Sequence, residues 1–112
     1  MERTPTIPAV DPALLAEVVR RILGAGSPER IVLFGSHATG TARPDSDLDL
    51  LVIEPSNLPR FRRSPKYLRA LVGVYPAKDV VVWTPEEIAA WRNVPHAFIT
   101  SVLREGRTLY ER

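Results

Sequence analysis

Residues 30–54 have the sequence RIVLFGSHATGTARPDSDLDLLVIE, and this stretch decides the fold and carries the candidate chemistry. Its first part, Ile31 to Phe34, is an apolar run of strand length that stops at Gly35-Ser36, where small residues let a backbone turn approach a ligand. If a short helix begins at Ser36, its first amide groups and the serine hydroxyl face an anion beyond the strand end. The pattern therefore predicts phosphate binding at Gly35 and Ser36.

A pair of carboxylates follows the turn. A second strand is expected from about Asp47, and because side chains alternate along a strand, Asp47 and Asp49 share one face. Residues two apart on a strand lie roughly 6.5 Å apart at Cα. Carboxylates at that spacing can converge on divalent metal ions about 3.5–4 Å apart. The alternative is that the two aspartates blunt a solvent-facing strand edge.

The combination of Gly35-Ser36 with Asp47-Leu48-Asp49-Leu50 resembles the signature of the DNA polymerase β-type nucleotidyltransferases. The chain is most similar to their minimal nucleotidyltransferase (MNT) branch, and the resemblance covers most of its length, including a third carboxylate at Asp79. It implies an α/β fold in which helices pack against a central mixed sheet. Members often carry an arginine in the turn after Gly-Ser, whereas this chain has His37 there.

The same resemblance implies a metal-dependent transfer of a nucleoside monophosphate, with ATP as the expected donor, to a hydroxyl group. Gly35 and Ser36 would bind the nucleotide, and Asp47, Asp49 and Asp79 would hold two Mg²⁺ ions. Asp79 is also the expected general base, since an unpaired carboxylate heading an apolar run would be costly to bury without a metal. In the alternative interpretation, Asp79 only pairs with its neighbour Lys78 or caps its strand at the surface.

The resemblance also implies a partner. Proteins similar to the MNT branch act as antitoxins of a helical HEPN-type ribonuclease toxin, in some cases by adding adenylate to a tyrosine of that toxin. Two other functions stay open: a non-catalytic antitoxin that inhibits its toxin by docking, and a nucleotidyltransferase that acts on RNA or on a small molecule. The last would normally need a further domain to position its substrate.

Composition limits the class of protein. The 112 residues predict one nucleotidyltransferase domain over residues 11–112, after a flexible N-terminal arm at residues 1–10. With 15 basic and 13 acidic residues the net charge is only +2, so nucleic acid is not expected as a direct partner. The absence of cysteine excludes disulfides and thiolate zinc sites. No apolar run of transmembrane length and no signal-peptide pattern is present, which predicts a cytoplasmic protein.

Helix signals flank the central stretch on both sides. Asp11-Pro12 predicts a capped helix start, and Gly24 and Gly26 predict its end. A second helix is expected after Ser64-Pro65. Its predicted buried face comprises Tyr67, Leu68, Leu71 and Val72.

The C-terminal third predicts one strand and two helices. The continuous apolar run from Lys78 to Trp83 favours a strand buried on both faces at the sheet centre. Thr84 and Glu87 match a capping box that opens a helix. A last helix, ended by Gly106, is expected before a short tail at residues 108–110. Its apolar positions are Phe98, Ile99, Val102 and Leu103.

Several polar and aromatic residues have alternative roles. Asp45 is expected to end the turn, and the alternative is that it supports the metal ligands without binding the metal itself. His37 either lies in solvent or touches phosphate. The basic run at residues 60–63 is either a solvated loop or a contact for phosphate or an acidic partner. Trp83 and Trp91 are expected in the core or at a partner contact rather than under a nucleotide base. An apolar patch near the end of the chain is expected to bind a second copy or the toxin. The patch predicted for this role is Trp91, Phe98, Ile99 and Tyr110.

Overall fold

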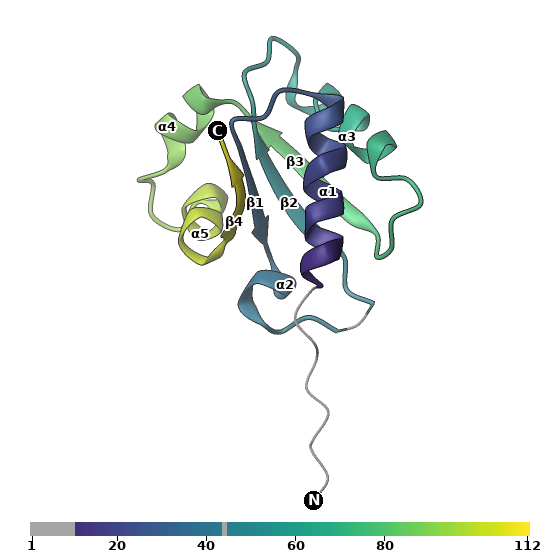
Figure 1. Cartoon of the computed structure of the whole chain (residues 1–112). Helices are drawn as coiled ribbons and strands as arrows, with labels where there is room; N and C mark the ends of the chain where they lie inside the picture. The colour runs from purple at the N-terminus through teal and green to yellow at the C-terminus, as the bar shows by residue number, and fades with distance from the viewer. Residues whose placement is uncertain (1–10, 44) are drawn as a thin grey trace, which may run out of the picture.

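A mixed four-stranded sheet in the order β3-β2-β1-β4 is the framework of the fold (Figure 1). The computed structural model describes residues 11–43 and 45–112, so the predicted N-terminal arm lies outside the described residues. The strands are β1 (Arg30–Phe34), β2 (Leu48–Ile53), β3 (Lys78–Trp83) and β4 (Arg107–Glu111). β1 pairs antiparallel with both β2 and β4, whereas β2 and β3 are parallel. The predicted α/β class with a mixed sheet is confirmed.

Helices α1 (Pro12–Ala25) and α3 (Pro65–Ala70) cover one face of this sheet (Figure 1). Helix α1 begins as predicted, because Asp11 Oδ1 accepts a hydrogen bond from the Ala13 amide at 2.9 Å and proline occupies the first turn. Its buried side chains join Tyr67 of α3 and the alternate residues of the strands in one core cluster. That cluster includes Leu15, Val18, Ile22, Leu48, Leu50, Val52, Val80 and Val82.

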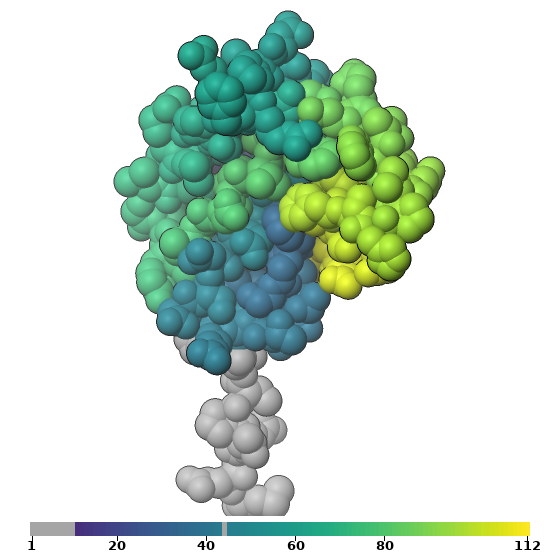
Figure 2. All heavy atoms as spheres, turned by 180° about the vertical axis from the view of Figure 1, so that it is seen from behind, coloured from purple at the N-terminus to yellow at the C-terminus, as the bar shows by residue number. Residues whose placement is uncertain are grey.

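Helices α4 (Pro85–Trp91) and α5 (Phe98–Glu105) pack on the opposite face, which Figure 2 views directly. The predicted capping box of α4 is present, since the Thr84 hydroxyl accepts from the Glu87 amide at 3.2 Å and Glu87 Oε1 accepts from the Thr84 amide at 2.8 Å. The second core cluster lies beneath these helices. It consists of Val32, Leu51, Ile53, Trp83, Ile88, Ile99 and Val102.

Three details of the predicted fold are wrong. β3 lies at an edge of the sheet rather than at its centre, with β2 as its neighbour. Its apolar run arises because alternate residues face the two helix layers, Val80 and Val82 on one side and Trp83 on the other. The predicted tail at residues 108–110 is part of β4, which completes the sheet beside β1. Helix α3 ends at Ala70, so its expected buried face is incomplete: Leu68 and Val72 are exposed.

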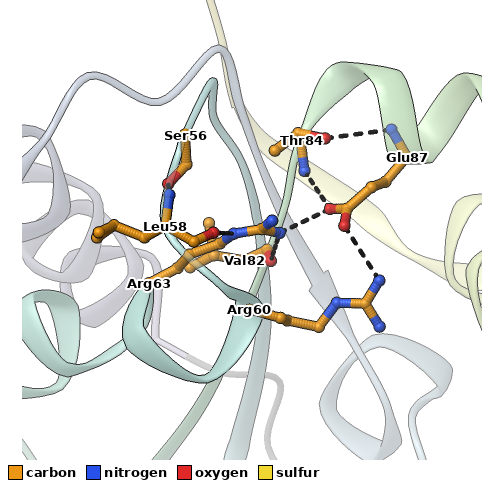
Figure 3. Close-up of polar contacts among 7 residues, drawn as sticks. All are labelled: Ser56, Leu58, Arg60, Arg63, Val82, Thr84 and Glu87. Carbon is orange, nitrogen blue, oxygen red and sulfur yellow. Dashed lines mark hydrogen bonds and ion pairs between the residues drawn. The ribbon is translucent and has the colours of Figure 1, made fainter.

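The basic run at residues 60–63 is more than a solvated loop, because two of its arginines bind a carboxylate within the fold (Figure 3). Arg63 is buried, and its guanidinium donates to the carbonyls of Leu58 (2.9 Å) and Val82 (3.3 Å) and to Glu87 Oε1 (2.6 Å). Arg60 reaches the other oxygen of the same carboxylate at 3.3 Å. Desolvation alone would raise the pKa of Glu87, but the hydrogen bonds from Arg63, the Thr84 amide and Arg60 lower it to about 2. These arginines therefore attach the loop after β2 to the start of α4.

A buried carboxylate, Glu54, was not identified from the sequence. It follows β2 and accepts hydrogen bonds from the Tyr67 hydroxyl at 2.5 Å and the Ser27 amide at 2.8 Å, with Lys66 Nζ at 3.0 Å. Burial opposes ionisation of Glu54, but these three partners lower its pKa overall. The cluster joins α1, β2 and α3 at the end of the sheet opposite the Gly35 turn.

Among the described residues, no helix is both long and apolar enough to cross a bilayer.

Candidate active site

The turn between β1 and α2 (Ser36–Thr39) has a backbone that only glycine adopts readily. Gly35 has a φ of 73° and a ψ of −155°, a combination essentially restricted to glycine. A Cβ atom at this position would lie 2.2 Å from Asp49 Oδ2, so the missing side chain also makes room for the carboxylate. The Gly35 carbonyl accepts from the amides of Ala38 and Thr39 at 3.0 and 3.1 Å. The short helix expected at Ser36 is therefore present, and it begins beside Asp49.

Pairing across the sheet brings two of the predicted carboxylates together. Asp49 is opposite Phe34 in the antiparallel register of β1 and β2, and it is opposite Asp79 in the parallel register of β2 and β3. Asp47 precedes β2 and is exposed, as is Asp79, whereas Asp49 is half-buried. The predicted placement of Asp79 beside the Asp47–Asp49 segment is thus what the register gives, although the catalytic roles of these residues stay predictions.

The charge around Asp49 is unfavourable. Burial raises the pKa of the Asp49 carboxyl, the nearby Asp79 and Asp47 carboxylates raise it further, and His37 opposes the rise. Neighbouring like charges disfavour simultaneous ionisation, and a cation bound between them would remove this penalty. The carboxylates of Asp47 and Asp79 are therefore close enough to act on Asp49.

His37 has a structural contact rather than a free position in solvent. Its Nε2 donates a hydrogen bond to the carbonyl of Ser46 at 2.8 Å, since a carbonyl oxygen can only accept. Ser46 Oγ in turn accepts from the Arg43 amide at 2.8 Å. The histidine thus ties α2 to the turn that leads into Asp47, which places that carboxylate near Asp49. The sequence offered no signal for this contact, because the two residues lie nine positions apart in a turn.

The side chains fit a hard divalent cation by their chemistry. Mg²⁺ prefers oxygen ligands and is commonly bound by one or two carboxylates together with substrate phosphates. Asp47, Asp49 and Asp79 offer carboxylate oxygens and no competing soft ligand, and Gly35 leaves room beside Asp49 Oδ2. Among the described residues, no three acidic or histidine side chains are already gathered at a spacing that would hold a metal ion. Mg²⁺ binding therefore stays a prediction that rests on the donor set.

The candidate site lies on the sheet face that carries α4 and α5. Residues directly opposite in an antiparallel pair point to the same face, so Asp49 shares the face of Phe34, which packs against the core under these helices. Leu51 and Ile53, the next alternate residues of β2, belong to that core. On this face, the blue α2 segment and the yellow-green α5 lie next to each other (Figure 2). Along this face of β2, the buried side chains of Leu51 and Ile53 are thus followed by the half-buried Asp49 near the start of the strand.

Comparison with known families gives one match that spans most of the chain. The model for "Nucleotidyltransferase domain" matches residues 14–105, which include every predicted site residue. None of the curated protein sequences compared with the chain matches it significantly.

Three solved structures that match this fold share less than a quarter of their residues with this chain. A toxin–antitoxin structure with AMP-PNP aligns with a TM-score of 0.65 at 19% identity, over 88% of this chain and 73% of the other. A candidate nucleotidyltransferase from Sulfolobus solfataricus aligns with a TM-score of 0.61 at 22% identity, over 88% and 78%. The tri-AMPylated HEPN toxin of Shewanella oneidensis in complex with its MNT antitoxin gives 0.60 at 16% identity, over 89% and 71%. These matches confirm the predicted polymerase β-type fold.

Proposed function

The chain belongs to the nucleotidyltransferase domain family, and from this premise we propose that it transfers AMP from ATP to a hydroxyl group of a partner protein. The observation that carries the proposal is the position of Asp49, which lies opposite Asp79 across β2 and β3 and fills the space that Gly35 leaves open. A glycine turn suited to phosphate thus adjoins the carboxylates that a divalent cation needs.

Each predicted residue has a role in that reaction. The backbone of Gly35 and the hydroxyl of Ser36 hold the distal phosphates at the start of α2. Asp47, Asp49 and Asp79 are the residues that would hold Mg²⁺, which when bound neutralises the negative charge on the phosphate oxygens. Asp79 accepts the proton of the acceptor hydroxyl. The hydroxyl oxygen bonds to the α-phosphorus, the bond to the β-phosphate oxygen breaks, and pyrophosphate leaves.

We place the acceptor on a HEPN-type ribonuclease toxin, with a tyrosine as the modified residue. The support is the shared fold with the MNT antitoxin whose toxin partner is tri-AMPylated, together with the AMP-PNP bound in another toxin–antitoxin structure. The protein would then act as an antitoxin in the cytoplasm, by chemical modification of its partner.

A non-catalytic antitoxin is the second candidate function, and one observation favours it. Trp91 is 48% exposed at the end of α4, and the nearby Val94 is 38% exposed. The Val94 amide donates to the Trp91 carbonyl at 3.1 Å, so the two apolar side chains belong to one turn. Apolar surface of this kind is typical of a docking site. Inhibition by docking alone would need this surface and not the aspartates.

A labelling experiment tests the proposal. The protein is incubated with a purified HEPN-type toxin and ATP radiolabelled at the α-phosphate, with Mg²⁺ or with EDTA. A parallel reaction uses ATP labelled at the γ-phosphate, which separates nucleotidyl transfer from phosphoryl transfer. We expect the toxin to take up only the α-label, only with Mg²⁺, and not with the Asp49→Asn variant.

The other outcomes separate the alternatives. Label that appears on RNA or on a small molecule in a host lysate would assign a different acceptor. Inhibition of the toxin by both the wild type and Asp49→Asn, without label on any acceptor, would identify a docking antitoxin. Transfer of the γ-label would contradict nucleotidyl transfer itself.

A further inference from the structure

Three aromatic rings form a continuous group between the candidate site and α4. Phe98, the first residue of α5, contacts Phe34 edge to face with ring centroids 5.5 Å apart, and it lies 6.2 Å from Trp83 at an interplanar angle of 31°. The guanidinium of Arg60 covers Trp83 at 4.3 Å. We call Phe34, Trp83 and Phe98 the aromatic shelf.

The shelf has one accessible ring. Trp83 is 8% exposed and Phe34 is half-buried, whereas Phe98 is 47% exposed. Phe98 contacts both other rings, which restricts its orientation before any ligand binds. An aromatic ring held in this way loses little conformational freedom when a ligand packs on its open side. Phe34 and Trp83 support Phe98, and Phe98 is the ring that a ligand can reach.

The shelf adjoins the phosphate turn and the carboxylates. Phe34 is the residue before Gly35, and it is paired with Asp49 in the register of β1 and β2. Phe98 packs on Phe34, so its ring lies on the face of the sheet that carries Asp49. If the α-phosphate of a nucleotide lies at the aspartates, only the ribose separates its base from them. Phe98 is the exposed ring that contacts Phe34, whose strand partner is Asp49.

We propose that Phe98 binds the base of the nucleoside triphosphate by stacking, with Phe34 and Trp83 as its support. The inference rests on the proposed function, which places a nucleotide at Gly35 and the aspartates, and it adds the residue that recognises the nucleoside half. Stacking on an aromatic side chain tolerates any base, because every base has a π face, and it changes affinity by about tenfold or more. Phe98 therefore supplies affinity for the base rather than a choice among bases.

Isothermal titration with two ligands in Mg²⁺ buffer tests this inference. ATP carries a base, and inorganic tripolyphosphate offers the phosphates alone. We expect Phe98→Ala to weaken ATP binding by about tenfold and to leave tripolyphosphate binding within about twofold of the wild type. Phe98→Tyr keeps a π face and should retain most of the ATP affinity. Circular dichroism checks that each variant is folded.

Trp91→Ala is the matched control, because Trp91 is as exposed as Phe98 but makes no ring contact with the shelf. It should leave both affinities unchanged. If Phe98→Ala weakens ATP and tripolyphosphate equally, or changes neither, Phe98 does not bind the base. The same holds if Phe98→Leu, which preserves apolar bulk without a π face, binds ATP as tightly as Phe98→Tyr.

Failure of the proposed function gives a different result from failure of this inference. A wild-type protein that binds neither ATP nor tripolyphosphate contradicts both. A wild-type protein that binds ATP no more tightly than tripolyphosphate keeps the phosphate site and overturns the shelf alone.

Discussion

Asp49 and Asp79 lie directly opposite each other in the parallel register of β2 and β3, at the end of the sheet where β1 enters the Gly35 turn. Burial and the carboxylates of Asp79 and Asp47 raise the pKa of Asp49. A raised folded-state pKa means that protonated Asp49 stabilises the fold at low pH and that this contribution is lost as the pH rises. At neutral pH and without a bound cation, ionised Asp49 therefore lowers the free energy of unfolding. The proposed metal site needs this carboxylate despite that cost.

The first prediction separates the effect of Asp49 on protein stability from its effect on the transfer rate. Asp49→Asn should lower the transfer rate by about 10³-fold or more, because a metal ligand is lost. In Mg²⁺-free buffer the same variant should melt a few degrees above the wild type, since like-charge repulsion is relieved. Single-turnover transfer and calorimetry measure the two effects. Asp45→Asn, an exposed change in the preceding turn, is the control and should alter neither quantity.

The second prediction concerns Asp79 as the general base. Asp79→Asn should still bind Mg²⁺ and ATP through Gly35, Ser36 and the other two aspartates, but kcat should fall more than affinity. A nucleotide titration beside a single-turnover assay separates the two parameters. Full activity in the folded variant would remove Asp79 from the catalytic site and leave it as a simple strand cap.

The short motif around Gly35 could be interpreted from sequence because its signals are local. A strand that stops at glycine, a helix start at Ser36 and alternating aspartates depend on neighbours a few residues apart. The capping box of Thr84 and Glu87 and the cap of α1 at Asp11 were predictable for the same reason. The catalytic roles came from the family resemblance and not from these local patterns.

The errors concern pairings between distant segments. An apolar run reports that both faces of β3 are covered, but not how many strands flank it, so the run after Asp79 gave the wrong position in the sheet. β4 was missed because it is a partly covered edge strand with charged ends, Arg107 and Glu111, and weak alternation. Ile99, expected at a partner surface, is fully buried in the core of α4 and α5.

The contacts of the arginines could not be predicted either, because a basic run does not indicate which residues it binds. Arg63 is 8% exposed and binds Glu87, which lies 24 residues away in the sequence. Buried Glu54 and Tyr67 form their hydrogen bond across 13 residues. Such pairs depend on the tertiary fold. From residue type alone, a charged side chain is expected at the surface.

The third prediction follows from the carboxylate that the two arginines share. Arg63→Ala should destabilise the protein by about 3 kcal/mol, because it leaves the Glu87 carboxylate and two carbonyls without their buried donor. Arg62→Ala is the control and should be nearly neutral, since the Arg62 guanidinium only approaches the exposed Phe61 ring at 5.9 Å. Urea unfolding measures both. Equal effects of the two substitutions would contradict a structural role for Arg63.

The pH dependence of that network has a defined sign. The pKa of Glu87 falls from 4.5 to about 2 on folding, so its stabilisation is present above pH 4.5 and is lost as the pH falls toward 2. Glu87→Gln should therefore reduce the stability difference between neutral pH and a pH of about 3. A variant curve parallel to the wild-type curve would mean that Glu87 does not titrate in this range.

The fourth prediction concerns the exposed turn that contains Trp91 and Val94. If this turn binds the toxin, Trp91→Ala should weaken the complex by about tenfold or more, as loss of a buried aromatic at an interface commonly does. Nucleotide binding should be unchanged, because Trp91 makes no ring contact with the aromatic shelf. Size-exclusion chromatography with light scattering reports the complex. A stable complex with Trp91→Ala would assign toxin binding to another surface.

The last prediction uses three glycines to separate backbone strain from crowding at the site. Gly35→Ala combines a φ of 73° with a Cβ position 2.2 Å from Asp49 Oδ2, so it should both destabilise the fold and displace the carboxylate. Gly40→Ala has a φ of 80° but nothing within 4 Å, so it measures the strain alone, about 1 kcal/mol or slightly more.

Gly24→Ala completes this series, because Gly24 lies inside α1 and a Cβ atom added there would have no neighbour within 4 Å. Alanine there should stabilise the protein by roughly 0.5–1 kcal/mol. Only Gly35→Ala should lose transfer activity, since only this substitution moves Asp49 relative to Asp79. Thermal unfolding and the transfer assay, measured on all three variants, test that expectation. Normal activity in a folded Gly35→Ala protein would show that the space beside Asp49 is not required for catalysis.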